Sequence, residues 1–376
     1  MGTREVILMI NEQRMINNLL DYIQIDSETK NEKAMCDYVA KQMKDLGFEV
    51  IVDQAGAKIE SNGYNICVKY PGDKTKDPVL LSAHLDTVTP GKGIKPIIED
   101  GILKSDKTTI LGGDDKAGVA IIVECLQTII ENNLATRPLE AVFSIYEEGG
   151  LKGAKEFDVS VLKAKEGVVI DSGGPIGSIV TTAPGQDSIN VDIHGKAAHA
   201  GMEPEKGVSA IQIAARALEN MTLYRIDEET TANFGIINGG VATNIITDHV
   251  HLAGETRSLS NEKIDQQTAR MKEAFEKAAT ELGGSVNFSV ERVYNSFTVD
   301  ENSKIVTGLK AAFLENGFTP QCVPTGGGSD TNIYFAKGIN CVNISCGMSA
   351  AHTTDEYIKI SDINDCAKSL FTFLTK

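Results

Sequence analysis

The chain has 376 residues, 41% of them hydrophobic, which is enough for two domains, or for one large one, around a well-buried core. Its formal net charge of −16 would repel nucleic-acid phosphates, and no run of Lys or Arg forms a local basic patch, so we do not expect nucleic acid as a partner. The seven cysteines are odd in number, contain no C-x-x-C pair and mostly lie in apolar segments, so we expect buried thiols rather than disulfides.

The N-terminal segment carries no targeting signal that we recognise. The apolar run at 6–10 is too short for the core of a signal peptide, and polar residues follow it in place of a small-residue cleavage site. Nowhere else are eighteen consecutive residues apolar, so we expect no association with a membrane. We therefore predict a globular, cytoplasmic protein.

The first 150 residues alternate between helical and strand-like patterns. Apolar residues recur with helical period at 12–24, 32–46 and 115–131, and short β-rich runs occupy 50–52, 64–70, 79–82 and 139–145. The helix at 115–131 would begin directly after Asp114, where acids favour a helix start. This alternation predicts an α/β domain with a mixed, mainly parallel sheet between helices.

The pattern changes after Asp171. We expect a strand at 188–194, a helix at 207–221, strands at 232–238 and 249–256, a helix at 261–282 and a strand at 285–293. This β-α-β-β-α-β order predicts a small α+β domain whose four-stranded sheet carries two helices on one face. The alternating α/β pattern then returns, with a helix at 302–316, a strand at 341–345 and a helix at 361–375. We therefore interpret residues 186–296 as a domain inserted into another domain, which is formed by 1–185 and 297–376.

Acids and histidines stand where an open α/β sheet presents side chains to a ligand, at the ends of strand-like runs or in Gly-rich turns. They are His84, Asp114, Glu147, Glu148, Asp171 and His352. Taken singly, each is more often structural than functional: an H-x-D sequence is frequent by chance, one acid at a helix start is an ordinary N-cap, and two adjacent acids often lie on the surface.

Taken together, these residues indicate a metal centre. Two histidines and three carboxylates form the nitrogen and oxygen ligand set that suits a pair of zinc-like ions, and such a pair activates water for amide hydrolysis without a Ser or Cys nucleophile. Glu147 and Glu148 point in different directions, so one carboxylate can bind metal while the other acts as a base. Asp86 is placed to orient His84 if the strand persists through both residues.

Four motifs, in this order and spacing, carry a resemblance that covers nearly the whole chain. They are H-L-D-T-V at 84–88, G-D-D-K-A-G at 113–118, Y-E-E-G-G at 146–150 and H-T at 352–353. The chain resembles the dinuclear zinc exopeptidases and deacylases that include peptidase T, carboxypeptidase G and aminoacylase, and it looks most like the peptidase T branch.

The resemblance implies roles for individual residues. His84 and Asp171 would bind one zinc, Glu148 and His352 the other, and Asp114 would bridge them, with Co²⁺ or Mn²⁺ as alternative ions. Glu147 would be the general base and Asp86 the carboxylate that orients His84. The family pattern also implies a cis peptide bond between Asp114 and Asp115.

The insertion resembles the lid domain of the same family. The resemblance implies that His199, in the sequence G-K-A-A-H-A-G at 195–201, helps to hold the substrate carbonyl, whereas a lone loop histidine would otherwise be a solvent-exposed residue. Asn244 and Arg257 match positions that contact substrate, although a surface salt bridge is nearly as good an account of Arg257. Gly327 and Gly328 match a flexible loop whose amides suit an anionic terminus. The lid also implies a homodimer.

The remaining histidines carry no functional signal. His249 and His251 alternate along a predicted strand, so we interpret them as ordinary sheet residues, and His194 has no partner that the sequence can name.

These expectations combine into one predicted function and two alternatives. We expect a zinc-dependent aminopeptidase that acts on short, tripeptide-like peptides. An N-acyl amino acid deacylase would use the same zinc chemistry with a different pocket. A non-catalytic, metal-dependent peptide-binding protein is the third hypothesis, against which the base candidate beside an intact ligand set argues.

Overall fold

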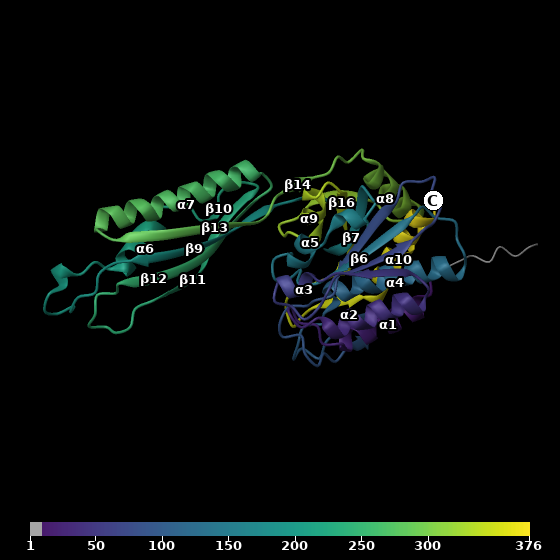
Figure 1. Ribbon diagram of the computed structural model, residues 1–376, viewed down its shortest axis with the longest axis horizontal. Helices are drawn as coiled ribbons and strands as arrows, with labels where there is room; N and C mark the ends of the chain where they lie inside the picture. Colours follow the sequence, from purple (N-terminus) through teal and green to yellow (C-terminus); the bar gives the residue numbers. More distant parts are fainter. Residues whose placement is uncertain (1–9) are drawn as a thin grey trace, which may run out of the picture. The chain divides into compact units, whose positions relative to one another are not determined.

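The structure, a computed structural model, describes residues 10–376 (Figure 1). The apolar run considered above as a leader segment therefore lies outside the described residues, except for Ile10. The chain divides into two compact units. The first, here called the α/β unit, comprises the residues up to 181 together with 298–325 and 329–376; the second, the inserted unit, comprises 182–297 and 326–328. The sequence had placed these boundaries between 185 and 186 and between 296 and 297.

Within residues 10–376, the α/β unit is built on a nine-stranded sheet of order β1-β2-β6-β3-β7-β16-β8-β14, with β15 also pairing with β8. The strands are β1 (Glu49–Val52), β2 (Ile66–Tyr70), β3 (Val79–His84), β6 (Leu139–Ser144), β7 (Glu166–Gly173), β8 (Ser178–Ala183), β14 (Phe297–Thr298), β15 (Gln321–Pro324) and β16 (Asn340–Met348). The central pairs β6-β3, β3-β7 and β7-β16 are parallel, whereas β1-β2, β2-β6 and β16-β8 are antiparallel. The prediction of a mixed, mainly parallel sheet between helices is confirmed, and the parallel pairs are the central ones.

Helices pack against this sheet and thereby bury their apolar faces. They are α1 (Glu12–Gln24), α2 (Lys33–Asp45), α3 (Ala55–Lys58), α4 (Gly113–Glu131), α5 (Lys152–Glu156), α8 (Lys304–Glu315), α9 (Asp330–Ala336) and α10 (Ile360–Thr375), with a 3₁₀ turn at Val159–Val161. Helix α4 is buried almost all round, because it contacts β3 and β7 as well as α1 and α10. That position explains its nearly continuous apolar sequence.

A smaller antiparallel sheet of order β17-β5-β4 completes the α/β unit. It consists of β4 (Ile97–Glu99), β5 (Ile102–Lys104) and β17 (Tyr357–Lys359). Each of these strands has only three residues, which is too few for an alternating pattern to predict a strand from the sequence. Strand β17 matters for the site, since it directly follows the loop that carries His352.

The inserted unit is an antiparallel sheet of order β10-β11-β12-β9-β13, with α6 and α7 packed on one face (Figure 1). Its elements are β9 (Gly185–His194), a 3₁₀ turn at Pro204–Lys206, α6 (Ala210–Glu219), β10 (Tyr224–Arg225), β11 (Thr230–Gly239), β12 (His249–Ser258), α7 (Asn261–Leu282) and β13 (Ser285–Tyr294). In β9, Ile189, Val191 and Ile193 are buried while the residues between them are not, so the strand shows the expected alternation. The predicted β-α-β-β-α-β order is confirmed, and the two-residue β10 adds a fifth strand at one edge.

Two further expectations concern the described residues as a whole. All seven cysteines are free and six of them are buried, which confirms the prediction of thiols. No helix between residues 10 and 376 combines the length and the apolar character needed to cross a bilayer.

Candidate metal centre

The candidate ligands of the α/β unit come from neighbouring strands at one edge of the parallel sheet. His84 is the last residue of β3, Glu147 and Glu148 follow β6, and Asp171 lies on β7. Since these strands are parallel, their carboxyl ends meet at one edge. Asp114 lies at the start of α4, in a segment whose backbone is not yet helical.

The Asp114 carboxylate lies between the two histidines. Its Oδ1 is 3.2 Å from His84 Nε2, and its Oδ2 is 3.3 Å from His352 Nε2. The same His84 nitrogen is 3.9 Å from Asp171 Oδ1, and the same His352 nitrogen is 2.9 Å from the Glu148 carboxylate. The Asp114 carboxylate therefore presents one oxygen to each histidine, as expected of a ligand that bridges two ions.

Three overlapping sets of residues could hold metal ions, because the donor atoms of each set lie within 4.8 Å of one another. They are His84 with Asp114 and Asp171, His84 with Glu147 and Glu148, and Asp114 with Glu148 and His352. The first and third sets contain all five ligands that the resemblance implied and share Asp114. The second places Glu147 beside the ligands. This nitrogen and oxygen donor set fits a pair of divalent ions.

The electrostatics of the cluster also fit cations. Burial raises the pKa of Glu147 well above its usual value, and burial together with Asp114 does the same for Asp171. Hydrogen bonds to Asp114 and Glu148 raise the pKa of His352 to about 10. Several carboxylates are thus held together out of water, where their mutual repulsion is costly unless positive charge is supplied. Divalent ions at these donors would supply it.

Asp86 supports the cluster through backbone groups. Its Oδ1 accepts a hydrogen bond from Glu147 N at 2.9 Å, and its Oδ2 accepts from Glu148 N at 3.2 Å and from the Thr29 hydroxyl at 2.8 Å. The His84 Nδ1 lies 2.9 Å from the Asp86 carbonyl oxygen and 3.5 Å from its carboxylate. The nearest acceptor for that ring nitrogen is therefore the carbonyl, which leaves Nε2 directed at the other ligands.

The peptide bond between Asp114 and Asp115 is cis, as the resemblance implied. Asp115 is fully buried. Its carboxylate accepts hydrogen bonds from His84 N at 3.2 Å and from Gly118 N at 3.1 Å. The second acid of the pair thus joins the end of β3 to the first turn of α4.

Two buried polar residues next to the ligands escaped the sequence analysis. Asn343, on β16, accepts from Asp171 N at 2.9 Å and donates to Asp171 O at 2.8 Å. Glu356 accepts hydrogen bonds from Leu111 N, Gly112 N and Asp114 N at 2.8, 2.9 and 3.0 Å. In the sequence, Asn343 is visible only as an amide inside an apolar strand, and Glu356 only as an acid four residues after His352. Neither pattern is specific enough to predict a role.

Two of the predicted substrate residues lie together in the inserted unit. His199 forms an isolated antiparallel bridge with Ile245, and Ala200 N donates to Asn244 O at 3.0 Å. The His199 Nδ1 accepts hydrogen bonds from Gly201 N and Met202 N, both at 3.1 Å. Because Nδ1 is an acceptor, the ring proton is on Nε2, and that group is a donor.

Arg257 is engaged within the inserted unit. Its Nε is 2.9 Å from Glu255 Oε1, so the salt bridge that we weighed as the alternative is present. Its Nη1 donates to Gly326 O at 3.4 Å, which links it to the glycine loop. Gly328 packs on Tyr294 so closely that an added Cβ would lie 2.2 Å from the ring.

The other histidines of the inserted unit have an ordinary partner. His249 Nε2 and His251 Nδ1 lie 3.1 and 3.2 Å from the same oxygen, Asp192 Oδ1. His194 packs beside His249, with ring centroids 5.1 Å apart. These residues lie on the face of the sheet opposite the helices, where β9 and β12 alternate between buried and more exposed positions.

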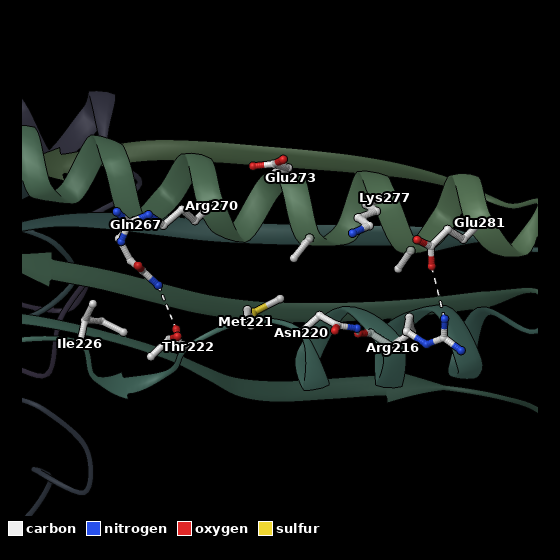
Figure 2. A pocket seen from close by; sticks show the side chains of 12 residues that line it. Arg216, Asn220, Met221, Thr222, Ile226, Gln267, Arg270, Glu273, Lys277 and Glu281 are labelled. Atoms are coloured by element: carbon white, nitrogen blue, oxygen red, sulfur yellow. Dashed lines mark hydrogen bonds and ion pairs between the residues drawn. The ribbon is translucent and has the colours of Figure 1, made fainter.

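A groove of about 730 Å³ lies between α6 and α7, well apart in sequence from every candidate ligand (Figure 2). Its charged residues partly pair with each other, as Arg216 does with Glu281 at 3.3 Å, and Gln267 donates to Thr222 O. The groove contains none of the predicted site residues.

Comparisons with known proteins place the chain in a family. The family model for the peptidase dimerisation domain matches residues 181–282, and that for peptidase family M28 matches residues 65–196. The uncharacterized protein YqjE of Bacillus subtilis (strain 168) is 40% identical over 366 residues, which are 97% of this chain and 99% of the relative.

Solved structures of similar proteins cover nearly the whole chain. The aminopeptidase PepT from Bacillus cereus is 43% identical with a TM-score of 0.91, over 98% of this chain and 99% of its own. A tripeptidase from Staphylococcus aureus is 39% identical with a TM-score of 0.94, over 98% of both chains. The chain therefore belongs to the peptidase family that includes the aminopeptidase PepT, and it is an enzyme of this peptidase T-like branch.

Proposed function

We propose that this enzyme is an aminopeptidase that releases the N-terminal residue of short peptides, tripeptides above all, and that it uses two divalent ions, preferably Zn²⁺. The observation that carries the proposal is the position of the Asp114 carboxylate, with one oxygen 3.2 Å from His84 and the other 3.3 Å from His352. The aminopeptidase and tripeptidase with similar structures support the substrate class.

The contacts support the ligand roles that the family resemblance implied. His84 and Asp171 would hold one ion, Glu148 and His352 the other, and Asp114 both. Bound there, the ions would polarise the scissile carbonyl and lower the pKa of the attacking water.

Glu147 is the proposed general base. It is buried, and its carboxylate lies within 4.8 Å of donor atoms of Glu148 and His84, which is where a base acting on a metal-bound water would lie. Burial raises the pKa of its carboxyl, which suits a group that takes a proton from the attacking water and then gives it to the leaving amine. Asp86 fixes the backbone of Glu147 and so its direction.

The inserted unit would supply substrate contacts and dimerisation, so we assign 186–296 as the lid and 1–185 with 297–376 as the catalytic domain. The His199 Nε2–H is free to donate to the carbonyl oxygen as negative charge develops on it, and Asn244 lies beside it. Arg257, Gly327 and Gly328 would bind the terminal carboxylate of the peptide. The dimerisation-domain match supports a homodimer.

The test is the change Glu147→Gln, which keeps size and polarity but removes the base. We expect tripeptide hydrolysis to fall by roughly 10²- to 10⁴-fold while bound metal is unchanged. The same change at exposed Glu99 is the control and should have no effect. Activity retained in Glu147→Gln would refute the assigned base. Hydrolysis of N-acyl amino acids in preference to tripeptides would refute the assigned substrate and favour a deacylase.

A further inference from the structure

The loop that carries Asp114 turns several backbone amides toward one buried carboxylate. Leu111 N, Gly112 N and Asp114 N all donate to Glu356, at 2.8 to 3.0 Å, and its side chain is 1% exposed. An unpaired amide at such depth would cost about 1–3 kcal/mol. Leu111 N and Gly112 N bind Oε2 while Asp114 N binds Oε1, so both carboxylate oxygens of Glu356 are used as acceptors.

Glu356 also belongs to the loop that carries His352. Its own amide donates to Thr353 O at 3.2 Å, and the Thr353 hydroxyl donates to Ala350 O at 2.7 Å, so residues 350–356 form one compact turn. Strand β17 follows directly and anchors the turn by pairing with β5. The side chain of Glu356 therefore joins the two loops that hold Asp114 and His352.

The fit between the two loops is close. At Gly113, an added Cβ would lie 2.4 Å from Ile358 Cδ1 and 3.1 Å from Glu356 Oε1, so a larger residue there would require the Ile358 side chain to move. Asp114 faces His352 across 3.3 Å, and a change of a few tenths of an ångström in either loop would disturb two ligands at once.

We propose that Glu356 is a positioning residue for the metal centre: by binding the amides of the 111–114 loop, it fixes the bridging Asp114 relative to His352. The inference rests on the proposed metal centre. Glu356 contacts backbone amides rather than the ligand side chains, so its effect should appear in metal affinity and not only in turnover.

The experiment compares Glu356→Gln with Asp355→Asn in the full-length enzyme. Asp355 is the neighbouring acid, and it is 70% exposed in an ion pair with Lys107, so its substitution removes one negative charge without touching the buried amides. Zn²⁺ affinity is measured by competition with a chromogenic chelator, and melting is measured in EDTA. We expect Glu356→Gln to weaken Zn²⁺ binding about 10- to 100-fold, and Asp355→Asn to change it less than about twofold.

A purely structural role would give a different pattern. Glu356→Gln would then lower the melting temperature in EDTA but bind Zn²⁺ as the wild type does, which would overturn the inference. If the Gln variant does not fold, Glu356→Asp keeps the charge but is too short to reach all three amides, so its Zn²⁺ affinity should fall below that of Asp355→Asn; wild-type affinity would again overturn the inference.

The outcome also separates this inference from the proposed function. A wild-type enzyme that binds no Zn²⁺ would refute both the positioning role of Glu356 and the proposed function. Weakened Zn²⁺ binding in Glu356→Gln, together with a wild type that binds Zn²⁺ but cleaves no peptide, would leave the positioning role intact and refute only the peptidase assignment.

Discussion

Buried Asp187 of the inserted unit and the acidic cluster around Asp114 in the α/β unit are partnered in different ways. In the inserted unit, buried Asp187 is satisfied by its own neighbours, because Arg292 and the Thr268 hydroxyl both bind it. In the α/β unit, Asp114 and Glu148 share one histidine, His352, and burial raises the pKa of neighbouring Glu147. The difference shows how a structural charge can be told from a functional one: the first has a complete set of partners, and the second leaves room for a cation.

The largest expected effect breaks the cluster at its centre. Asp114→Asn removes the charge of the proposed bridge, so we expect Zn²⁺ affinity to fall at least about 100-fold and peptide hydrolysis to fall with it. The matched control is Asp192→Asn in the inserted unit, an acid that also contacts two histidines. Metal titration of both variants checks the comparison. Equal losses of Zn²⁺ affinity in the two variants would contradict the assignment of the metal centre to Asp114.

A second prediction concerns Asp330, a fully buried acid of the α/β unit. Burial raises its pKa from 3.8 to about 6; the Ser144 hydroxyl binds its Oδ2, and its Oδ1 has no partner among the described residues. Between these pH values the unfolded chain loses the proton before the folded protein does, so rising pH lowers stability. Most of a total change of about 3 kcal/mol falls between pH 4 and pH 7, since each unit of difference between the folded and unfolded pKa is worth about 1.4 kcal/mol.

Asp330→Asn cannot ionise, so its stability relative to the wild type should rise over the same interval. Urea unfolding in EDTA at several pH values measures this without a contribution from metal loss. The change Asp77→Asn, at an exposed position, controls for the removal of one negative charge. A constant difference between Asp330→Asn and the wild type at every pH would contradict the prediction.

A third prediction concerns the ion pair between Arg292 and Asp187 in the inserted unit. Arg292→Met leaves Asp187 with the Thr268 hydroxyl alone, and we expect a loss of about 2–3 kcal/mol in unfolding free energy, because Arg292 itself is partly exposed. Zn²⁺ content should not change. Arg216→Met makes the same substitution in an exposed pair with Glu281, where we expect less than about 1 kcal/mol. A larger effect at Arg216 would reverse the interpretation.

The smallest effect is expected on the open face of the inserted sheet. His249→Ala removes a half-exposed imidazole whose partner Asp192 keeps His251, so stability should change by less than about 0.5 kcal/mol. Chemical denaturation and metal analysis check this. A loss of bound metal would assign this face a role that we do not give it.

Sequence patterns predicted the long elements and pointed to the candidate ligands for physical reasons. The helices and strands around His84, Glu148 and Asp171 follow strong apolar periodicity, and charged residues at the ends of such runs are easy to see. The cis bond after Asp114 came only from the family resemblance, because no proline marks it.

The side chains that hold the backbone of the candidate ligands could not be predicted in the same way. Asn343 binds the backbone of Asp171 from 172 positions away, and Glu356 binds that of Asp114 from 242 positions away. A side chain that serves a distant amide leaves no local pattern in the sequence. The salt bridge between Arg257 and Glu255 could be weighed but not decided, because either a neighbouring acid or a substrate carboxylate suits an arginine.

The most direct test of the central claim is to count the metal ions in the purified enzyme and in His352→Ala. We predict two divalent ions per chain in the wild type and at most one in the variant, because His352 and Glu148 face only one side of the shared Asp114 carboxylate. Equal metal content in the two proteins, or no bound metal in the wild type, would contradict a two-metal centre at these residues.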